Sequence, residues 1–194
     1  GMGDGYTGFW ADLDCGPGPV TAFRFDMDCN EVAECAEESH RPVREGFASR
    51  WPGLMHACGH DGHAAVGLGL AEVLVSIRRH LRGRIRLIFQ PAEEGARGAL
   101  PMSEAGAVDG VDVLFGFHIG FKAEGPGSLI CGTQGFLATT KRDVLFSGVP
   151  AHAGAAPEEG KDALLAACSA VVNLHAISRN GKGGTRIAVG RLEG

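Results

Sequence analysis

Three short segments of the sequence carry side chains that can bind a metal ion and move a proton. Residues 56–63 read HACGHDGH, residues 91–95 read PAEEG, and residues 117–120 read FHIG. Thiolate, imidazole and carboxylate groups are the usual protein ligands of zinc and related divalent ions. A further carboxylate beside such ligands can act as a general base toward a metal-activated water. The sequence therefore predicts metal-assisted chemistry.

Cys58 and His60 are the first candidate ligands. Two residues apart in a loop, a thiolate and an imidazole can both reach one metal ion. A buried cysteine beside a helix-capping histidine would explain the pair about equally well on its own. Gly59 between them, and Asp61 as a carboxylate that could orient the imidazole, favour the metal site.

Glu93 and Glu94 can divide two roles, since one can bind metal while its neighbour takes a proton from water. Two solvated acids at the start of a helix are the alternative, and would be favoured for an isolated pair. Here Pro91 and Gly95 bracket the pair directly after an apolar strand, which favours the site. His118 also ends an apolar strand, where a histidine is ordinarily a core residue. The presence of the other four candidate residues indicates that it is a ligand.

Other polar residues near these segments are expected to support the ligands rather than to bind metal. His63 lies one helical turn beyond His60, within reach of a ligand, whereas His56 has the weaker case and could simply pack. Asp26 and Asp28 end a predicted strand, where they could orient ligands or pair with arginines such as Arg24.

The apolar pattern predicts an α/β domain. Asp61 is expected to cap a helix that Gly83 ends, residues 1–19 suggest an edge hairpin or frayed terminus, and residues 29–50 suggest a long loop. Alternating strands and helices indicate a mostly parallel sheet, whose strand ends should bring the candidate ligands to one rim. The predicted elements are strands at 20–28, 85–89 and 111–117 and helices at 61–82 and 98–105.

The composition changes near residue 135, which predicts a first domain at 1–135 and a second at 136–194. His152 lies in a loop rich in glycine and alanine, where it could donate a hydrogen bond to a developing oxyanion. The predicted elements of this second part are strands at 139–147 and 185–189 and a helix at 162–177.

Composition and charge exclude several classes of partner. Hydrophobic residues make up 44% of the 194 residues, so a core can form. The formal net charge of −5 argues against nucleic acid and anionic membrane surfaces as partners. No apolar run approaches the roughly 20 residues of a membrane span, and no signal peptide is visible. The six cysteines form no CxxC pair, which favours the cytoplasm.

Together these segments resemble a known family, the dinuclear metallo-amidohydrolases and metallopeptidases. That family includes aminoacylases, carboxypeptidases and indole-acetyl-amino-acid hydrolases. The resemblance runs from about residue 17 to 194 and rests on HACGHD at 56–61, IFQPAEEG at 88–95 and GFHIG at 116–120. Segments at 39–42, 45–50, 135–141 and 151–154 match a subgroup that hydrolyses p-aminobenzoyl-glutamate in folate catabolism.

The resemblance implies two divalent ions, zinc or manganese, held by Cys58, His60, Glu94 and His118. Glu93 would be the general base. His152 would steady the oxyanion, typically in the site of the partner protomer. The implied fold is a zinc-peptidase-like catalytic domain followed by part of an α+β lid or dimerisation domain. The implied protein is a cytoplasmic homodimer that cleaves p-aminobenzoyl-glutamate or a similar N-acyl amino acid. A second hydrolase subunit is a further candidate partner.

Members of this family are about twice as long as this chain. The resemblance therefore implies that a return segment of the catalytic domain, with a fifth ligand histidine, belongs beyond Gly194. A chain of only these residues would then bind metal weakly, expose apolar surface and lack turnover. Two alternatives stay open: an aminoacylase-like hydrolase of another acyl group, and a non-catalytic metal-binding or dimerising module.

Overall fold

The structure is a computed structural model that describes residues 7–95, 97–120, 125–132, 138–177 and 186–193. The chain forms two compact units, Gly1–Gly132 and Thr133–Gly194. None of the helices within the described residues is both long and apolar enough to cross a membrane. Residue 135, the predicted domain boundary, lies outside the described residues, so the division into a catalytic and a lid domain stays a prediction.

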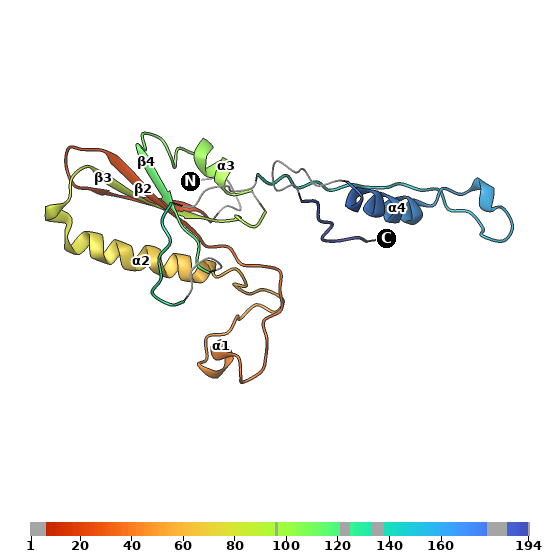
Figure 1. The fold of residues 1–194 in the computed structure, drawn as a ribbon, viewed down its shortest axis with the longest axis horizontal. Helices are drawn as coiled ribbons and strands as arrows, with labels where there is room; N and C mark the ends of the chain where they lie inside the picture. Colours follow the sequence, from red (N-terminus) through yellow and green to blue (C-terminus); the bar gives the residue numbers. More distant parts are fainter. Residues whose placement is uncertain (1–6, 96, 121–124, 133–137, 178–185, 194) are drawn as a thin grey trace. The chain divides into compact units, whose positions relative to one another are not determined.

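A four-stranded mixed sheet forms the centre of the first unit (Figure 1). Its order is β1-β3-β2-β4, in which β2 runs parallel to both β3 and β4, and β1 runs antiparallel to β3. The parallel relation of the three predicted strands is therefore correct, but the sheet as a whole is mixed. The strands are β1 (Phe9–Asp14), β2 (Val20–Asp26), β3 (Arg84–Gln90) and β4 (Val113–Gly116).

The prediction of an N-terminal edge hairpin is wrong, and residues 1–6, where the alternative of a frayed terminus would begin, lie outside the described residues. β1 does lie at an edge, but it pairs with β3 rather than with a strand of its own hairpin. It cannot pair with the next strand in sequence, because both edges of β2 are already hydrogen-bonded to β3 and β4. Strand order is set by these distant pairings and not by the short connection between β1 and β2.

Helices cover both faces of this sheet (Figure 1). The helix α2 (His60–Ser76) packs on one face, and α3 (Ala99–Glu104) packs on the other. Because successive side chains of a strand point to opposite faces, β3 contributes to both cores. The first core contains Phe25, Leu74, Ile85, Leu87 and Phe89, and the second contains Ala22, Ile88, Met102 and Ala107.

The observed ends of α2 correct two expectations. The helix begins at His60, which makes Gly59 the N-cap, with a left-handed backbone (φ 81°). Asp61 lies inside the helix and does not cap it. Asp61 still lies in the first turn, where a carboxylate favours the helix dipole. At the other end α2 stops at Ser76, and a separate 3₁₀ turn, η1 (Arg78–His80), precedes Gly83. The long loop before α2 contains one helical turn, α1 (Arg41–Arg44).

A buried arginine ties β1 to the rest of the unit. The Arg86 guanidinium donates from Nε and Nη2 to the two carboxylate oxygens of Asp12, at 2.7 and 2.8 Å. Its Nη1 donates to the backbone carbonyls of Gly106, Ala107 and Asp109 at 3.1–3.3 Å. The Arg86 side chain is only 8% exposed, so loss of its carboxylate partner would leave a buried charge less well compensated.

This ion pair predicts acid sensitivity. The hydrogen bond from Arg86 holds the pKa of Asp12 below its usual 3.8. A carboxyl with a depressed pKa stabilises the fold fully above its unfolded pKa, and that contribution is lost as pH falls through the folded value. We expect Asp12→Asn to cost about 1–2 kcal/mol at neutral pH, the low part of the range for charged hydrogen bonds because Asp12 is 30% exposed.

Urea unfolding of the wild type and Asp12→Asn, measured at several values from pH 6 down to pH 2, checks this prediction. The difference between the two proteins should shrink as the pH falls below about 4. Glu72→Gln, a change at an exposed position of α2, is the matched control and should keep a constant difference. A constant difference for Asp12→Asn over the whole range would contradict the role given to this pair.

The second unit contains α4 (Ala163–His175) and the 3₁₀ turn η2 (Pro157–Glu159). Asp162 caps α4 by accepting a hydrogen bond from the Leu165 backbone N–H at 2.8 Å. The strand predicted at 139–147 is wrong, since the structure assigns none there. A strand needs a hydrogen-bonded neighbour, and in this unit the described residues pair only at the Val149–Lys161 bridge. Residues 186–189 form no strand either, while Thr185 lies outside the described residues.

Candidate metal centre

Four chain segments meet at one place in the first unit. Three of them follow the ends of β2, β3 and β4, and the fourth leads into α2. Cys58 and His60 lie at the start of α2, Glu93 and Glu94 follow β3, and His118 follows β4. Three sets of possible ligand atoms, each within 4.8 Å of one another, share His60. The first adds Cys58 and His118, the second adds Glu93 and Glu94, and the third adds Asp26 and His63. The residues that sequence reasoning selected as ligands, and the general base, are thus neighbours in space.

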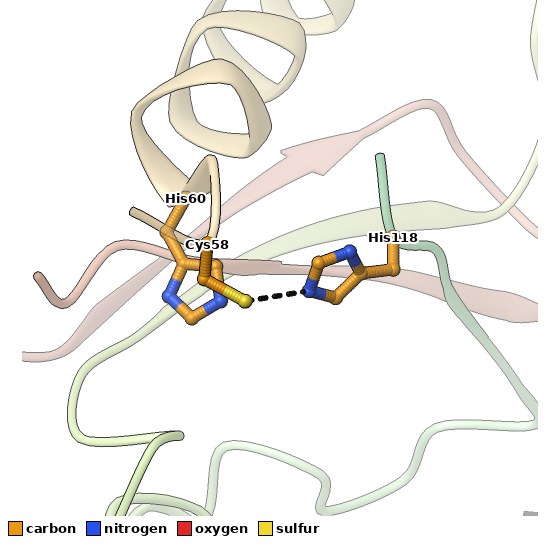
Figure 2. A group of neighbouring side chains, drawn as sticks. All are labelled: Cys58, His60 and His118. Carbon is orange, nitrogen blue, oxygen red and sulfur yellow. Dashed lines mark hydrogen bonds between the residues drawn. The ribbon is translucent and has the colours of Figure 1, made fainter. Parts of the chain in front are cut away.

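Cys58 and His118 face each other across this centre (Figure 2). The Cys58 Sγ lies 3.4 Å from His118 Nε2. The other nitrogen of His118, Nδ1, lies 2.8 Å from the Ile119 carbonyl oxygen, to which only an N–H can donate. His118 Nε2 therefore presents a lone pair toward Cys58. A metal ion could accept both groups in this orientation.

His60 provides the test of whether these residues fit a metal ion. Its side chain is fully buried. Nδ1 lies 3.0 Å from the Asp28 carbonyl and 3.1 Å from Asp28 Oδ1, so Nδ1 carries the proton. The buried Nε2 finds no hydrogen-bond donor among the described residues. It faces Glu93 Oε2 at 3.9 Å and Glu94 Oε1 at 4.0 Å. A buried lone pair aimed at two carboxylates is what a divalent cation would complete.

Asp28 links two of the ligand segments. Besides the His60 ring, its carboxylate accepts a hydrogen bond at 3.1 Å from the Glu94 backbone N–H. Burial on its own would raise the pKa of Asp28, but the backbone N–H groups of Glu94 and Glu93 outweigh it, so the pKa lies below its usual value. Asp28 therefore stays ionised and orients both the imidazole and the turn with the two glutamates.

Cys58 is held by a residue that sequence reasoning missed. The Asn30 side chain accepts a hydrogen bond at 3.1 Å from the Cys58 backbone N–H, and no sequence motif marks this contact. Burial, together with the hydrogen bond and charge of Glu94, raises the pKa of the Cys58 thiol to about 11. The thiol therefore keeps its proton in the metal-free protein, and metal binding must displace it.

Asp26 and His63 lie behind the ligands. The Ile119 backbone N–H donates to His63 Nε2 at 3.0 Å, so His63 carries its proton on Nδ1, which faces Asp26 Oδ2 at 3.6 Å. Asp26 also pairs with the Arg24 guanidinium. Burial raises the pKa of Asp26 to about 6 and lowers that of His63 to about 4. Although Asp26, His60 and His63 form one of the sets of possible ligand atoms, the accepting nitrogen of His63 is already used by the Ile119 N–H.

The remaining predicted site residues lie elsewhere. Asp61 is exposed, and the carboxylate beside His60 Nδ1 is that of Asp28 instead. His56 is exposed and belongs to none of the three sets of possible ligand atoms. His152 belongs to the second unit, where its Nδ1 accepts hydrogen bonds at 3.1 Å from the backbone N–H groups of Gly154 and Ala155. The proton of neutral His152 is therefore on Nε2, which leaves that nitrogen able to donate.

Residues 22–188 match the model of Peptidase family M20/M25/M40. This chain belongs to that family. Two curated relatives of the chain are each 54% identical to it over 190 residues. One is indole-3-acetyl-aspartic acid hydrolase of Enterobacter agglomerans, and the other is a subunit of p-aminobenzoyl-glutamate hydrolase of Escherichia coli. The match covers 97% of this chain but 43% of each relative, so this chain spans less than half the length of either relative.

Solved structures of the M20/M25/M40 family agree with this fold. The aminobenzoyl-glutamate utilization protein of Klebsiella pneumoniae is 45% identical and superposes with a TM-score of 0.68 over 97% of this chain and 41% of its own. A dinuclear metal-binding M20 peptidase of Bacillus subtilis is 43% identical, with a TM-score of 0.52 over 58% of this chain and 30% of its own. The family resemblance predicted from the sequence motifs is confirmed.

Proposed function

We propose that the protein is a metal-dependent amidohydrolase that cleaves the amide bond between an acyl or aroyl group and an amino acid. The observation that carries this proposal is His60, buried, oriented by Asp28 and directed through its free lone pair at two glutamates. Such an arrangement gives no advantage to a purely structural histidine, because an unsatisfied buried nitrogen is costly. It suits a residue whose partner is a cation.

Four side chains are the proposed ligands of two divalent ions, zinc or manganese: Cys58, His60, Glu94 and His118. The donor set combines thiolate, imidazole and carboxylate, which suits zinc and is compatible with manganese. The Bacillus subtilis relative, which is described as dinuclear, supports the number of ions. When bound, the ions supply Lewis acidity that activates water and polarises the scissile carbonyl.

Glu93 is the proposed general base. Its side chain is 39% exposed, so a substrate and a water molecule can reach it, and Oε2 lies 3.9 Å from His60 Nε2. The carboxylate would take a proton from the attacking water and then give it to the leaving amide nitrogen. Glu94 is better placed as the ligand, because its carboxylate is hydrogen-bonded to the Cys58 thiol and its backbone is held by Asp28.

The proposed substrate is an aromatic acyl group joined to an acidic amino acid. Both relatives at 54% identity are named for such conjugates, one of aspartate and the other of glutamate. We take p-aminobenzoyl-glutamate as the first candidate. His152, with its proton on Nε2, would donate to the oxyanion.

The same proposal includes the setting in which the chain acts. Residues 136–194 would form part of a lid, and the protein would be a homodimer in the cytoplasm. A second hydrolase subunit is a further proposed partner. The Escherichia coli relative supports this last point, because its name describes it as one subunit of a hydrolase.

Metal content and hydrolysis, measured on the same preparation of the full-length protein, test this proposal. After loading with zinc or manganese we expect close to two ions per chain. We also expect release of p-aminobenzoate from p-aminobenzoyl-glutamate, loss of that activity in chelator, and recovery on adding metal back. p-Aminobenzoyl-glutamine, in which a neutral carboxamide replaces the side-chain carboxylate, is the matched control for the acidic preference. Absence of metal uptake would refute the proposal, and metal uptake without hydrolysis would favour a binding module.

A further inference from the structure

We infer that the first turn of α2 positions His118 by holding the next residue, Ile119, through His63 and Gly62. The inference rests on the proposed function, in which His118 is a metal ligand. It assigns His63 and Gly62 a positioning role that their residue types alone do not indicate. The contacts fall into three kinds: a backbone hydrogen bond, a close apolar contact, and the hydrogen bond that turns the His118 ring.

The backbone contact comes from His63. Its Nε2 accepts the Ile119 N–H at 3.0 Å across 56 residues of sequence. The ring is fully buried, and its Nδ1 faces Asp26 at 3.6 Å, which in turn pairs with Arg24 on β2. Nδ1 has no hydrogen-bond partner within the described residues, so the ring is held by its burial and by the Phe117 and His118 rings, whose centroids lie 5.0 and 4.6 Å away. The Ile119 N–H therefore has a fixed acceptor.

The apolar contact comes from the glycines of the same turn. A Cβ added to Gly62 would clash with the Ile119 Cδ1, and one added to Gly59 would lie 3.5 Å from it. With Ile119 in this rotamer, position 62 has no room for a Cβ, and an alanine there would push the flexible end of the Ile119 side chain aside. This contact is independent of the His63 hydrogen bond, because it involves the Ile119 side chain and not its backbone.

The third contact links Ile119 to the proposed ligand, His118. His118 Nδ1 donates to the Ile119 carbonyl at 2.8 Å, which directs Nε2 at Cys58 Sγ. β4 and its pairing with β2 end at Gly116, two residues before His118, so these contacts hold the ligand beyond the end of the strand. Groups that orient metal ligands typically change metal affinity about 10–100-fold when they are removed.

Four variants and one control test the inference through metal affinity, measured by competition with a chelating dye. His63→Leu removes the acceptor and should weaken binding about 10–100-fold, whereas His63→Gln keeps a carbonyl oxygen and should lose less. Gly62→Ala should weaken binding about 10-fold. Gly62→Ala/Ile119→Val, which deletes the clashing Cδ1, should restore it. Gly69→Ala, on α2 with open space around the added methyl, is the matched control and should bind like the wild type.

The absorption spectrum of the cobalt-loaded protein adds a readout that a purely structural role would not change. The thiolate-to-cobalt band of Cys58 should persist in His63→Leu and Gly62→Ala while the d–d bands shift with the displaced imidazole. Wild-type affinity and spectrum in both variants would overturn the inference. The inference would also be overturned if Ile119→Val did not restore the metal affinity lost in Gly62→Ala. It would be overturned as well if only one of His63→Leu and Gly62→Ala bound metal more weakly, because Ile119 would then not link the two residues to His118.

If His63→Leu fails to fold, the Gly62→Ala series decides on its own. Failure of the wild type to bind zinc or cobalt would instead refute the proposed function, and the inference would fall with it. Metal binding by the wild type that the variants share unchanged would refute the inference alone. The two failures are therefore distinguishable.

Discussion

Replacing Glu93 with alanine should lower kcat for p-aminobenzoyl-glutamate about 10²–10⁴-fold without loss of bound metal. The physical reason is that the Glu93 carboxylate transfers a proton in the reaction but is not one of the proposed metal ligands. Its oxygen lies 3.9 Å from His60 Nε2, and its side chain is 39% exposed, as a group that meets substrate must be. Steady-state kinetics and metal analysis on the same preparation measure both halves of this prediction.

Glu94→Ala is the matched comparison, because it removes the same side chain one residue later. This variant should lose metal as well as activity. Glu94 contacts Cys58, and both residues have possible ligand atoms within 4.8 Å of those of His60. Excess metal should partly restore Glu94→Ala but not Glu93→Ala. Normal turnover in Glu93→Ala, or equal metal loss in both variants, would refute the division of roles between the two glutamates.

Phe25→Ala should lower the free energy of unfolding by about 3–5 kcal/mol, the range for removing a large aromatic ring from a core. Phe25 is 1% exposed and packs against Phe89 and Phe117, with ring centroids 5.2 and 5.7 Å away. A cavity of this size between β2 and α2 cannot close easily, because Phe89 and Leu74 belong to the same cluster. Urea denaturation followed by circular dichroism measures the change.

Phe47→Ala deletes the same ring from a site that is 60% exposed, and should change stability by no more than about 0.5 kcal/mol. Phe25→Leu should lose less than Phe25→Ala because it leaves a smaller cavity. Equal effects of Phe25→Ala and Phe47→Ala would show that the core described around β2 does not stabilise the unit.

The parallel strands could be read from the sequence because each is a short apolar run that ends in polar residues. β2, β3 and α2 lie close to their predicted positions. Glu94 and His118 follow strand ends, and Cys58 and His60 lie at the start of α2, as expected. What could not be read is which distant segment pairs with which. The pairing of β1 with β3 depends on the edge that the other strands leave free. The alternation at 139–147 predicted a strand that finds no neighbour within the described residues.

The supporting contacts of the centre were missed for a related reason. Asp61 is adjacent to His60 in sequence, which made it the obvious orienting carboxylate, yet Asp28 is the one in contact with the ring. Asn30 touches Cys58 through its backbone, and His63 reaches the backbone of Ile119. Such side-chain-to-backbone contacts depend on tertiary packing, and no residue spacing encodes them.

The double contact of Asp28, with the His60 ring and with the Glu94 backbone, makes the centre preorganised. The entropy lost in ordering these side chains is already spent when the sheet folds, so an arriving ion needs to order little more. Folding and metal capture are then thermodynamically linked. An ion that binds only the folded chain raises its thermal midpoint, and substitutions that loosen the sheet lower metal affinity without touching a ligand.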